Sequence, residues 1–181
     1  GGNAVDAAVA TAFALAVVFP RAGNLGGGGF ALVQMAGQEP AALDFRETAP
    51  AAATRTMFME KRGNGAQERS LVGHMAVGVP GSVAGLWALH RRYGLLPWED
   101  VVAPSVLLAR VGFVVDADFV SSAALVAPLF ARFPASRALF ASPDHPLRVG
   151  DRWHNPDLGA TLERIAASGP GDFYRGETAR L

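Results

Sequence analysis

Residues 30–50 read FALVQMAGQEPAALDFRETAP, and this stretch decides the class of fold. Two apolar runs, at 30–36 and 41–45, flank the segment GQEP, whose glycine and proline favour a tight turn. The stretch therefore predicts a β-hairpin. Its second strand runs into a charged turn in which Arg46 stands close to Asp44 and Glu47.

Helices are predicted on both sides of this hairpin. Asn3 is a good N-cap for a helix over 4–18 that ends before Pro20. This helix is apolar nearly all round, so we expect it to be buried between other elements. A weaker pattern predicts a short helix over 53–63, followed by a mobile polar loop over 64–70.

The helical pattern becomes strong after Pro80. Ser82 can cap a helix whose apolar face carries Val83, Leu86, Trp87 and His90. Pro97 opens the next helix, in which Pro104 is expected to cause a break or kink and Gly112 to close the end.

Two more helices complete the pattern. One covers 116–133 with an interruption at Pro128, and the other runs from the cap Asn155 to the stop Gly169. Leu158, Leu162 and Ile165 form the apolar stripe of the second. A helix, a hairpin and then a series of helices make an α+β fold.

The composition is that of globular material. Half of the 181 residues are hydrophobic and 18% are charged, which excludes a disordered tail. Sixteen basic residues balance sixteen acidic ones, whereas a nucleic-acid-binding protein would show a basic face. The apolar run at 4–19 is shorter than the ~20 residues of a membrane span and lacks the basic residues that precede a signal-peptide core. Both ends look interrupted, so we expect a fragment of a longer protein.

Few residues have the pattern of a catalytic or metal site. The chain has no cysteine, which excludes disulfides, thiolate ligands and a cysteine nucleophile. The histidines lie far apart without metal-ligand spacing, so each is predicted to be a surface or capping residue: His74, His90, His145 and His154. No metal and no cofactor is predicted. The serines and threonines show no nucleophile elbow, and no complete active site is visible.

The four glycines at 26–29 allow three interpretations. A phosphate cradle is disfavoured, because no GK[ST] follows and the loop enters a strand where a phosphate loop enters a helix. The glycines can instead let two backbones pass closely, or present bare backbone N–H groups to a substrate.

Arg46 allows two interpretations. It can form a surface ion pair with Asp44 or Glu47, worth about 0–1 kcal/mol. It can also grip a ligand carboxylate through two parallel hydrogen bonds, which lysine cannot do. The local pattern alone favours the surface pair.

Six segments, in order along the chain, resemble the large subunit of the γ-glutamyltranspeptidases, which are also called glutathione hydrolases. These enzymes belong to the N-terminal-nucleophile (Ntn) hydrolases. The segments are GGNAVDAAVATAFAL, LGGGGFALV, LDFRETAP, VGVPGSVAGLWALHRRYG, LPWEDVVAPSVLLAR and FYRGETA.

The resemblance implies an αββα sandwich, of which residues 1–181 would form part of the large-subunit domain. Residues 1–50 would supply a helix and a sheet hairpin, and 51–181 a mainly helical lobe. Members of the family are single proenzymes that cleave themselves, and the new N-terminal threonine of the small subunit then attacks γ-glutamyl amides. This chain has no Thr-Thr pair, so the nucleophile is expected outside it and the chain alone is expected to be inactive.

The resemblance also makes Arg46 the ligand of the substrate α-carboxylate, with Asp44 and Glu47 as residues that could orient its guanidinium. The implied partners are a γ-glutamyl substrate, the rest of the large subunit and the small subunit, and an isolated fragment is expected to self-associate. Bacterial members imply a periplasmic or secreted location. Alternatives are an acylase of the cephalosporin-acylase or poly-γ-glutamate-depolymerase type, and a non-catalytic homologue that binds amino acids.

Overall fold

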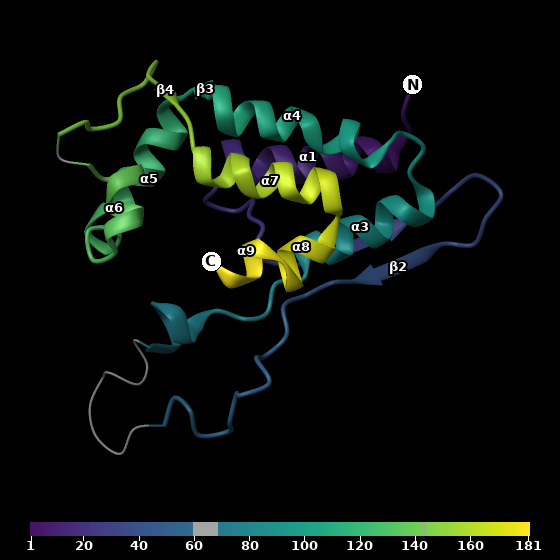
Figure 1. The fold of residues 1–181 in the computed structure, drawn as a ribbon, viewed down its shortest axis with the longest axis horizontal. Helices are drawn as coiled ribbons and strands as arrows, with labels where there is room; N and C mark the ends of the chain where they lie inside the picture. Colours follow the sequence, from purple (N-terminus) through teal and green to yellow (C-terminus); the bar gives the residue numbers. More distant parts are fainter. Residues whose placement is uncertain (60–68, 143) are drawn as a thin grey trace. The chain divides into compact units, whose positions relative to one another are not determined.

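The computed structural model describes residues 1–59, 69–142 and 144–181. Its elements fall into two compact units: Gly1–Asn24 with His90–Leu181, and Leu25–Leu89. Helices and short two-stranded sheets make up the chain (Figure 1), which confirms the predicted α+β class.

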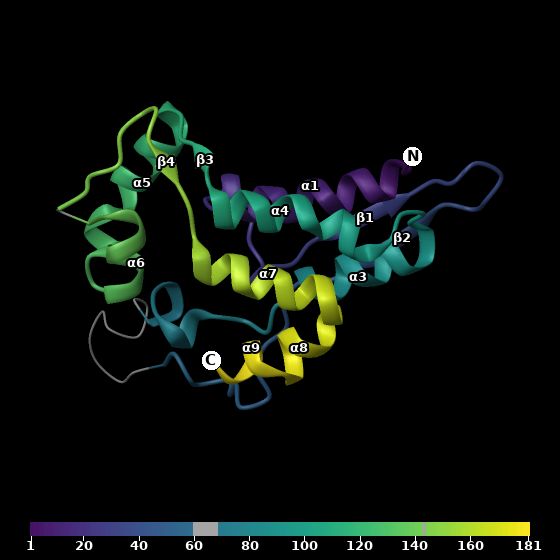
Figure 2. The same cartoon turned by 45° about the horizontal axis from the view of Figure 1, so that its top comes forward.

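Three helices form the centre of the first unit. They are α1 (Ala4–Val18), α4 (Trp98–Val111) and α7 (Pro156–Ser168). Helix α4 lies between the other two (Figures 1 and 2). Phe13, Val102 and Leu162, one from each helix, are fully buried. The stripe of α7 thus faces the core of this unit. Helix α1 buries one face there and leaves Ala8 and Leu15 exposed, so the predicted burial on all sides is not met among the described residues.

The start of α1 is fixed by side chains. Asn3 accepts hydrogen bonds from the backbone N–H groups of Val5 and Asp6, and Asp6 accepts one from the backbone N–H of Asn3. This reciprocal capping box satisfies N–H groups that have no partner within the helix. The predicted cap at Asn3 is confirmed.

A cluster of aromatic rings closes one end of the first unit. Its elements are β3 (Phe113–Val114), β4 (Arg152–Trp153), α5 (Ala117–Phe130) and α6 (Pro134–Phe140). Strands β3 and β4 pair antiparallel, with Phe113 opposite Trp153. The Trp153 ring lies 5.1–5.7 Å from the rings of Phe113, Phe119 and Phe140. Ring pairs at such separations add about 0.5–1.5 kcal/mol beyond their buried area.

The C-terminal segment is held by one carboxylate. Helices α8 (Pro170–Arg175) and α9 (Glu177–Arg180) follow α7 directly. Asp172 accepts hydrogen bonds from the Glu177 N–H at 2.9 Å and the Thr178 hydroxyl at 2.5 Å, and Arg164 Nε lies 3.2 Å away. These contacts give a structural reason for the polar residues around FYRGETA.

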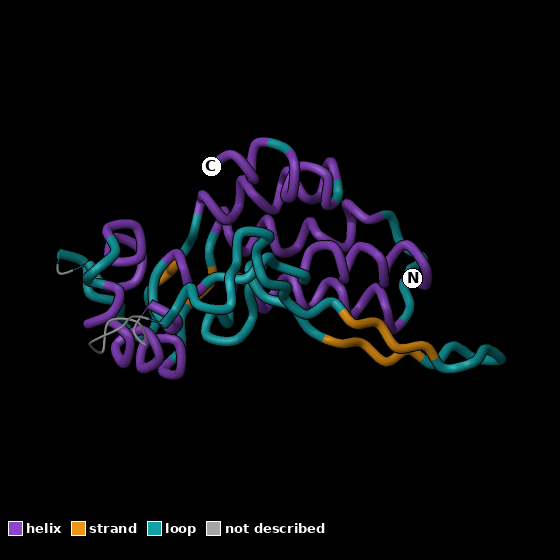
Figure 3. Tube along the Cα trace, turned by 90° about the horizontal axis from the view of Figure 1, so that it is seen from below, coloured by secondary structure: helices purple, strands orange, loops and turns teal. Residues whose placement is uncertain are grey.

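The second unit contains the predicted hairpin. Strands β1 (Phe30–Val33) and β2 (Ala41–Asp44) pair antiparallel, with Phe30 opposite Asp44 (Figure 3, orange). Thr48 and Val79 form a separate bridge, and a short 3₁₀ helix covers His74–Ala76. Helix α3 (Ser82–Tyr93) begins in this unit and ends in the first.

Three helix predictions need correction, and the first concerns Pro128, across which α5 continues to Phe130. Within the predicted helix at 53–63, residues 55–58 form turns, residues 53, 54 and 59 have no regular structure, and residues 60–63 lie outside the described residues. Of the predicted loop at 64–70, residues 64–68 lie outside them too, whereas Arg69 and Ser70 are helical.

Pro104 neither breaks nor divides α4, which is continuous across it. Proline removes one backbone hydrogen bond and leaves the carbonyl four residues earlier without its usual donor. Pro104 and Asp100 are both on the exposed side of α4, where water can satisfy that carbonyl. The helix therefore tolerates the proline.

Candidate functional site

Arg46 lies two residues after β2, next to backbone that is still paired. The Phe45 N–H donates to the Gly29 carbonyl at 2.9 Å, and the Gly29 N–H donates to the Phe45 carbonyl at 3.3 Å. The hairpin pairing thus extends one step beyond the strands. As a result, the residue before Arg46 has a fixed backbone position.

Glycines surround Phe45. A methyl group added at Gly28 or Gly81 would collide with the Phe45 carbonyl oxygen, and one added at Gly85 would collide with the Phe45 ring. Gly81 and Ser82 also donate backbone hydrogen bonds to the Gly27 carbonyl, at 2.8 and 2.9 Å. Of the three interpretations of the glycine run, these contacts favour the close passage of two backbones.

Among the described residues, the Arg46 guanidinium has a carboxylate at Nε and an aromatic ring near its carbon. Its Nε donates to Glu47 Oε2 at 3.0 Å, and its Cζ lies 5.8 Å from the centroid of the Phe30 ring. The side chain is 62% exposed. Within residues 1–59, 69–142 and 144–181, no acceptor contacts its two terminal nitrogens.

The two neighbouring carboxylates have different roles. Glu47 contacts the guanidinium, whereas Asp44 Oδ1 accepts the backbone N–H of Arg46 at 3.0 Å. Asp44 therefore fixes the turn and contacts the main chain. The sequence suggested that both acidic residues could orient the guanidinium, whereas among the described residues only Glu47 contacts it.

The Glu47 carboxylate is stabilised in its charged form. A hydrogen bond from its own backbone N–H and then one from the Arg46 side chain hold the pKa of Glu47 below its usual value, with a smaller contribution from the Gly28 N–H. Limited burial opposes this shift. Glu47 is therefore ionised at neutral pH and remains a charged partner for Arg46.

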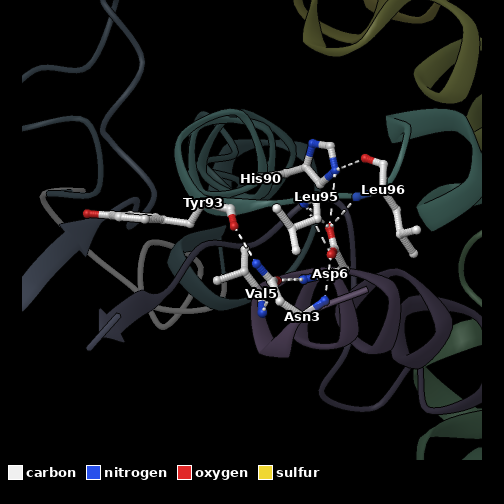
Figure 4. A network of polar contacts seen from close by, with 7 residues as sticks. All are labelled: Asn3, Val5, Asp6, His90, Tyr93, Leu95 and Leu96. Carbon is white, nitrogen blue, oxygen red and sulfur yellow. Dashed lines mark hydrogen bonds and ion pairs between the residues drawn. The ribbon is translucent and has the colours of Figure 1, made fainter. Parts of the chain in front are cut away.

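A second polar cluster, in the first unit, was not predicted from the sequence (Figure 4). Asp6 is 3% exposed and accepts backbone N–H groups from Asn3, Leu95 and Leu96. His90 Nε2 lies 2.9 Å from the Leu96 carbonyl and 3.5 Å from Asp6 Oδ1. The ring is buried against the corner that follows α3, so the surface alternative for His90 is wrong, whereas its place on the predicted apolar face of the helix agrees with its burial.

The hydrogen-bond partner of His90 Nε2 decides which ring nitrogen carries the proton. The Leu96 carbonyl can only accept, so the His90 proton is placed on Nε2. His90 Nδ1 is buried and has no partner within the described part of the chain. The other three histidines, His74, His145 and His154, are exposed, and the described residues contain no group of side chains suited to hold a metal ion.

Comparison with known proteins identifies the family. The profile of the Gamma-glutamyltranspeptidase family matches residues 1–181. The chain is 48% identical to the glutathione hydrolase proenzyme of Pseudomonas aeruginosa over 182 residues, which cover all of this chain and 32% of that protein. The chain therefore belongs to the γ-glutamyltranspeptidase family, as the six sequence segments indicated.

Solved structures agree with this assignment. The γ-glutamyltranspeptidase of Helicobacter pylori matches with a TM-score of 0.95 and 41% identity, over 100% of this chain and 52% of that one. A cephalosporin acylase of Bacillus halodurans matches with a TM-score of 0.84 and 30% identity, over 99% of this chain and 33% of that one. The chain spans about a third of the length of the curated relatives it matches.

Proposed function

We propose that the full-length protein containing these residues cleaves γ-glutamyl amides such as glutathione and transfers the γ-glutamyl group to water, an amino acid or a peptide. The observation that carries this proposal is Arg46. Its guanidinium is exposed, is supported on the Nε side by Glu47 and leaves both terminal nitrogens available among the described residues. The family profile matches residues 1–181, which include Arg46.

In the proposed mechanism Arg46 holds the α-carboxylate of the substrate. A guanidinium can donate two parallel hydrogen bonds to a carboxylate, which fixes both its position and its orientation. Holding that end of the substrate directs the γ-carbonyl toward the nucleophile and lowers the entropic cost of the attack.

The nucleophile is supplied from outside these residues, by the N-terminal threonine of the small subunit. Its hydroxyl oxygen attacks the γ-carbonyl while its own α-amine accepts the hydroxyl proton. The amide C–N bond breaks, and the leaving amine takes up a proton. Water or an acceptor amine then cleaves the resulting ester. Residues 1–181 alone have no activity in this scheme.

The proposal includes partners and a location. The remainder of the large subunit and the small subunit complete the enzyme, and the full-length protein is exported to the periplasm or secreted. Among the described residues, no helix has the length and apolar character required to cross a bilayer. Cell fractionation of the full-length protein tests the location, and recovery in the cytoplasmic fraction would contradict it.

Replacing Arg46 with lysine in the full-length protein tests the role of this residue. Lysine keeps the charge but loses the planar fork. We expect KM for a γ-glutamyl anilide to rise about tenfold or more, as for the loss of a hydrogen bond to a charged group. Self-cleavage into two subunits should continue. Arg148→Lys, an exposed arginine of the other unit, is the matched control, and an unchanged KM in Arg46→Lys would make Arg46 a surface residue.

An acylase with the same nucleophile is the second candidate, because a cephalosporin acylase shares this fold over nearly the whole chain. A glutaryl group keeps the carboxylate that Arg46 would bind and lacks only the ammonium group. A comparison of γ-glutamyl and glutaryl amides on the full-length protein therefore separates the two activities. Turnover of the glutaryl amide alone would overturn the proposed function.

A further inference from the structure

The exposed face of the hairpin brings an aromatic ring to Arg46. The alternating exposure of β1 and β2 places Phe30, Leu32, Ala42 and Asp44 on one face. Phe30 is directly opposite Asp44, and Arg46 follows Asp44 by two residues. Diagonal neighbours across an antiparallel pair are within reach when one side chain is aromatic and the other long.

Phe30 is 65% exposed among the described residues. Its ring centroid lies 5.8 Å from Arg46 Cζ, within the range in which a cation is attracted to an aromatic face. Glu47 occupies Nε of the same guanidinium at 3.0 Å. The guanidinium is therefore contacted by a ring at its carbon and by a carboxylate at Nε.

These two contacts restrict how a ligand can bind. A guanidinium offers a carboxylate either the side edge that includes Nε or the end edge formed by Nη1 and Nη2. Glu47 occupies the side edge, and the end edge has no protein acceptor among the described residues.

We infer that Phe30 is a positioning residue for Arg46, and that Phe30 and Glu47 together make Arg46 receive the substrate carboxylate end-on, through Nη1 and Nη2. This inference rests on the proposed function, because it assumes a carboxylate substrate at Arg46. It assigns a role to Phe30, and it specifies which edge of Arg46 the substrate uses.

Kinetics of Phe30→Leu in the full-length protein test the positioning role. Leucine keeps an apolar side chain but has no ring face. We expect KM for a γ-glutamyl anilide to rise about two- to fivefold, as for the loss of an exposed cation–π contact, with kcat nearly unchanged because substrate and transition state share this contact. Phe30→Trp should have a KM close to that of the unmodified protein, since tryptophan gives the strongest cation–π contact of the aromatic residues.

A matched control and a matched substrate separate positioning from folding. Leu32→Ala changes an 88% exposed side chain on the same face and should leave KM unchanged. For 4-aminobutyryl anilide, which lacks the α-carboxylate, Phe30→Leu should have no effect. An unchanged KM in Phe30→Leu, or an equal rise with both substrates, would overturn the inference. Absence of γ-glutamyl turnover in the unmodified protein would instead overturn the proposed function.

A structure of the full-length protein with bound glutamate tests the end-on geometry directly. The expected result places both α-carboxylate oxygens within hydrogen-bond distance of Nη1 and Nη2, with Glu47 still on Nε. A carboxylate bound at Nε, with Glu47 displaced, would contradict it.

Discussion

Asp6 illustrates, at the scale of one residue, how a charge is accommodated inside an apolar helix. The carboxylate is buried, yet it accepts N–H groups from the start of α1 and from Leu95 and Leu96, about ninety residues later in the chain. Burial raises the pKa of Asp6, but the hydrogen bonds from Asn3, Leu95 and Leu96 and the nearby His90 outweigh this and hold the pKa below its usual value. The ionised form is therefore the stable one in the folded protein.

Replacing Asp6 with asparagine should destabilise the full-length protein by about 3 kcal/mol, because buried N–H groups lose a charged acceptor and face an NH₂ group. The thermal midpoint measures this loss. Asp100→Asn, the same substitution at an exposed position in the first turn of α4, is the control and should cost only a few tenths of a kcal/mol. Equal losses of stability in both variants would show that the buried Asp6 carboxylate contributes no more to folding than the exposed Asp100 carboxylate.

The stability that Asp6 provides should depend on pH. Its folded pKa lies below the ordinary value of 3.8, so its contribution is complete above that value and is lost as pH falls through the lower folded pKa. The difference in thermal midpoint between the unmodified protein and Asp6→Asn should be constant near neutral pH and shrink below about pH 4. A difference that grows on acidification would contradict this assignment.

At the scale of elements, the position of Arg46 depends on how tightly the hairpin end passes the start of α3. Gly81 stands where a Cβ atom would collide with the Phe45 carbonyl. The carbonyl belongs to backbone, which cannot move away as a flexible side chain can. The glycine is required here by a close approach between two segments.

Gly81→Ala should destabilise the full-length protein by about 1–3 kcal/mol, as for overpacking, and should raise KM because the residue next to Arg46 is displaced. Gly171→Ala is the control, since a Cβ there has nothing within 4 Å and alanine favours the helix in which it lies. Thermal midpoints and KM values of both variants provide the comparison. A Gly81→Ala protein as stable and active as the unmodified one would exclude the tight passage.

Long elements were predictable from the sequence because their signals are local. The cap at Asn3, the stripe of α7 and the turn between β1 and β2 each depend on residues within one or two turns of chain. Strands β3 and β4 were missed because two residues cannot show a period-2 pattern. The contacts of His90 were missed because Leu96 lies on the corner after α3 and Asp6 is 84 positions earlier. Arg46 was found, but the ring of Phe30 beside it depends on hairpin register, which the sequence pattern did not specify.

At the scale of the whole molecule, several large apolar side chains are exposed. Leu32 on β1 is 88% exposed, and Leu125 on α5, which lines an apolar cavity of about 380 Å³ in the first unit, is 82% exposed. Monomeric proteins seldom leave extended apolar patches uncovered.

Isolated residues 1–181 should therefore self-associate. Light scattering after size-exclusion chromatography should give a mass above 18.9 kDa that increases with concentration. The double variant Leu32→Lys with Leu125→Lys should reduce this association, whereas Arg148→Lys should not. A concentration-independent monomer would contradict the prediction.

The first unit is discontinuous, since Leu25–Leu89 separates Gly1–Asn24 from His90–Leu181. During synthesis α1 leaves the ribosome well before the segment that covers it. His90 follows Asn24 by 66 residues (90 − 24). At a synthesis rate of about 5–20 residues per second, this separation is a delay of roughly 3–13 seconds. For that time an apolar helix has neither α4 beside it nor Leu95 and Leu96 to bind Asp6. The nascent chain should therefore bind chaperones that shield apolar segments, and it should be most prone to aggregation before residue 111 has emerged.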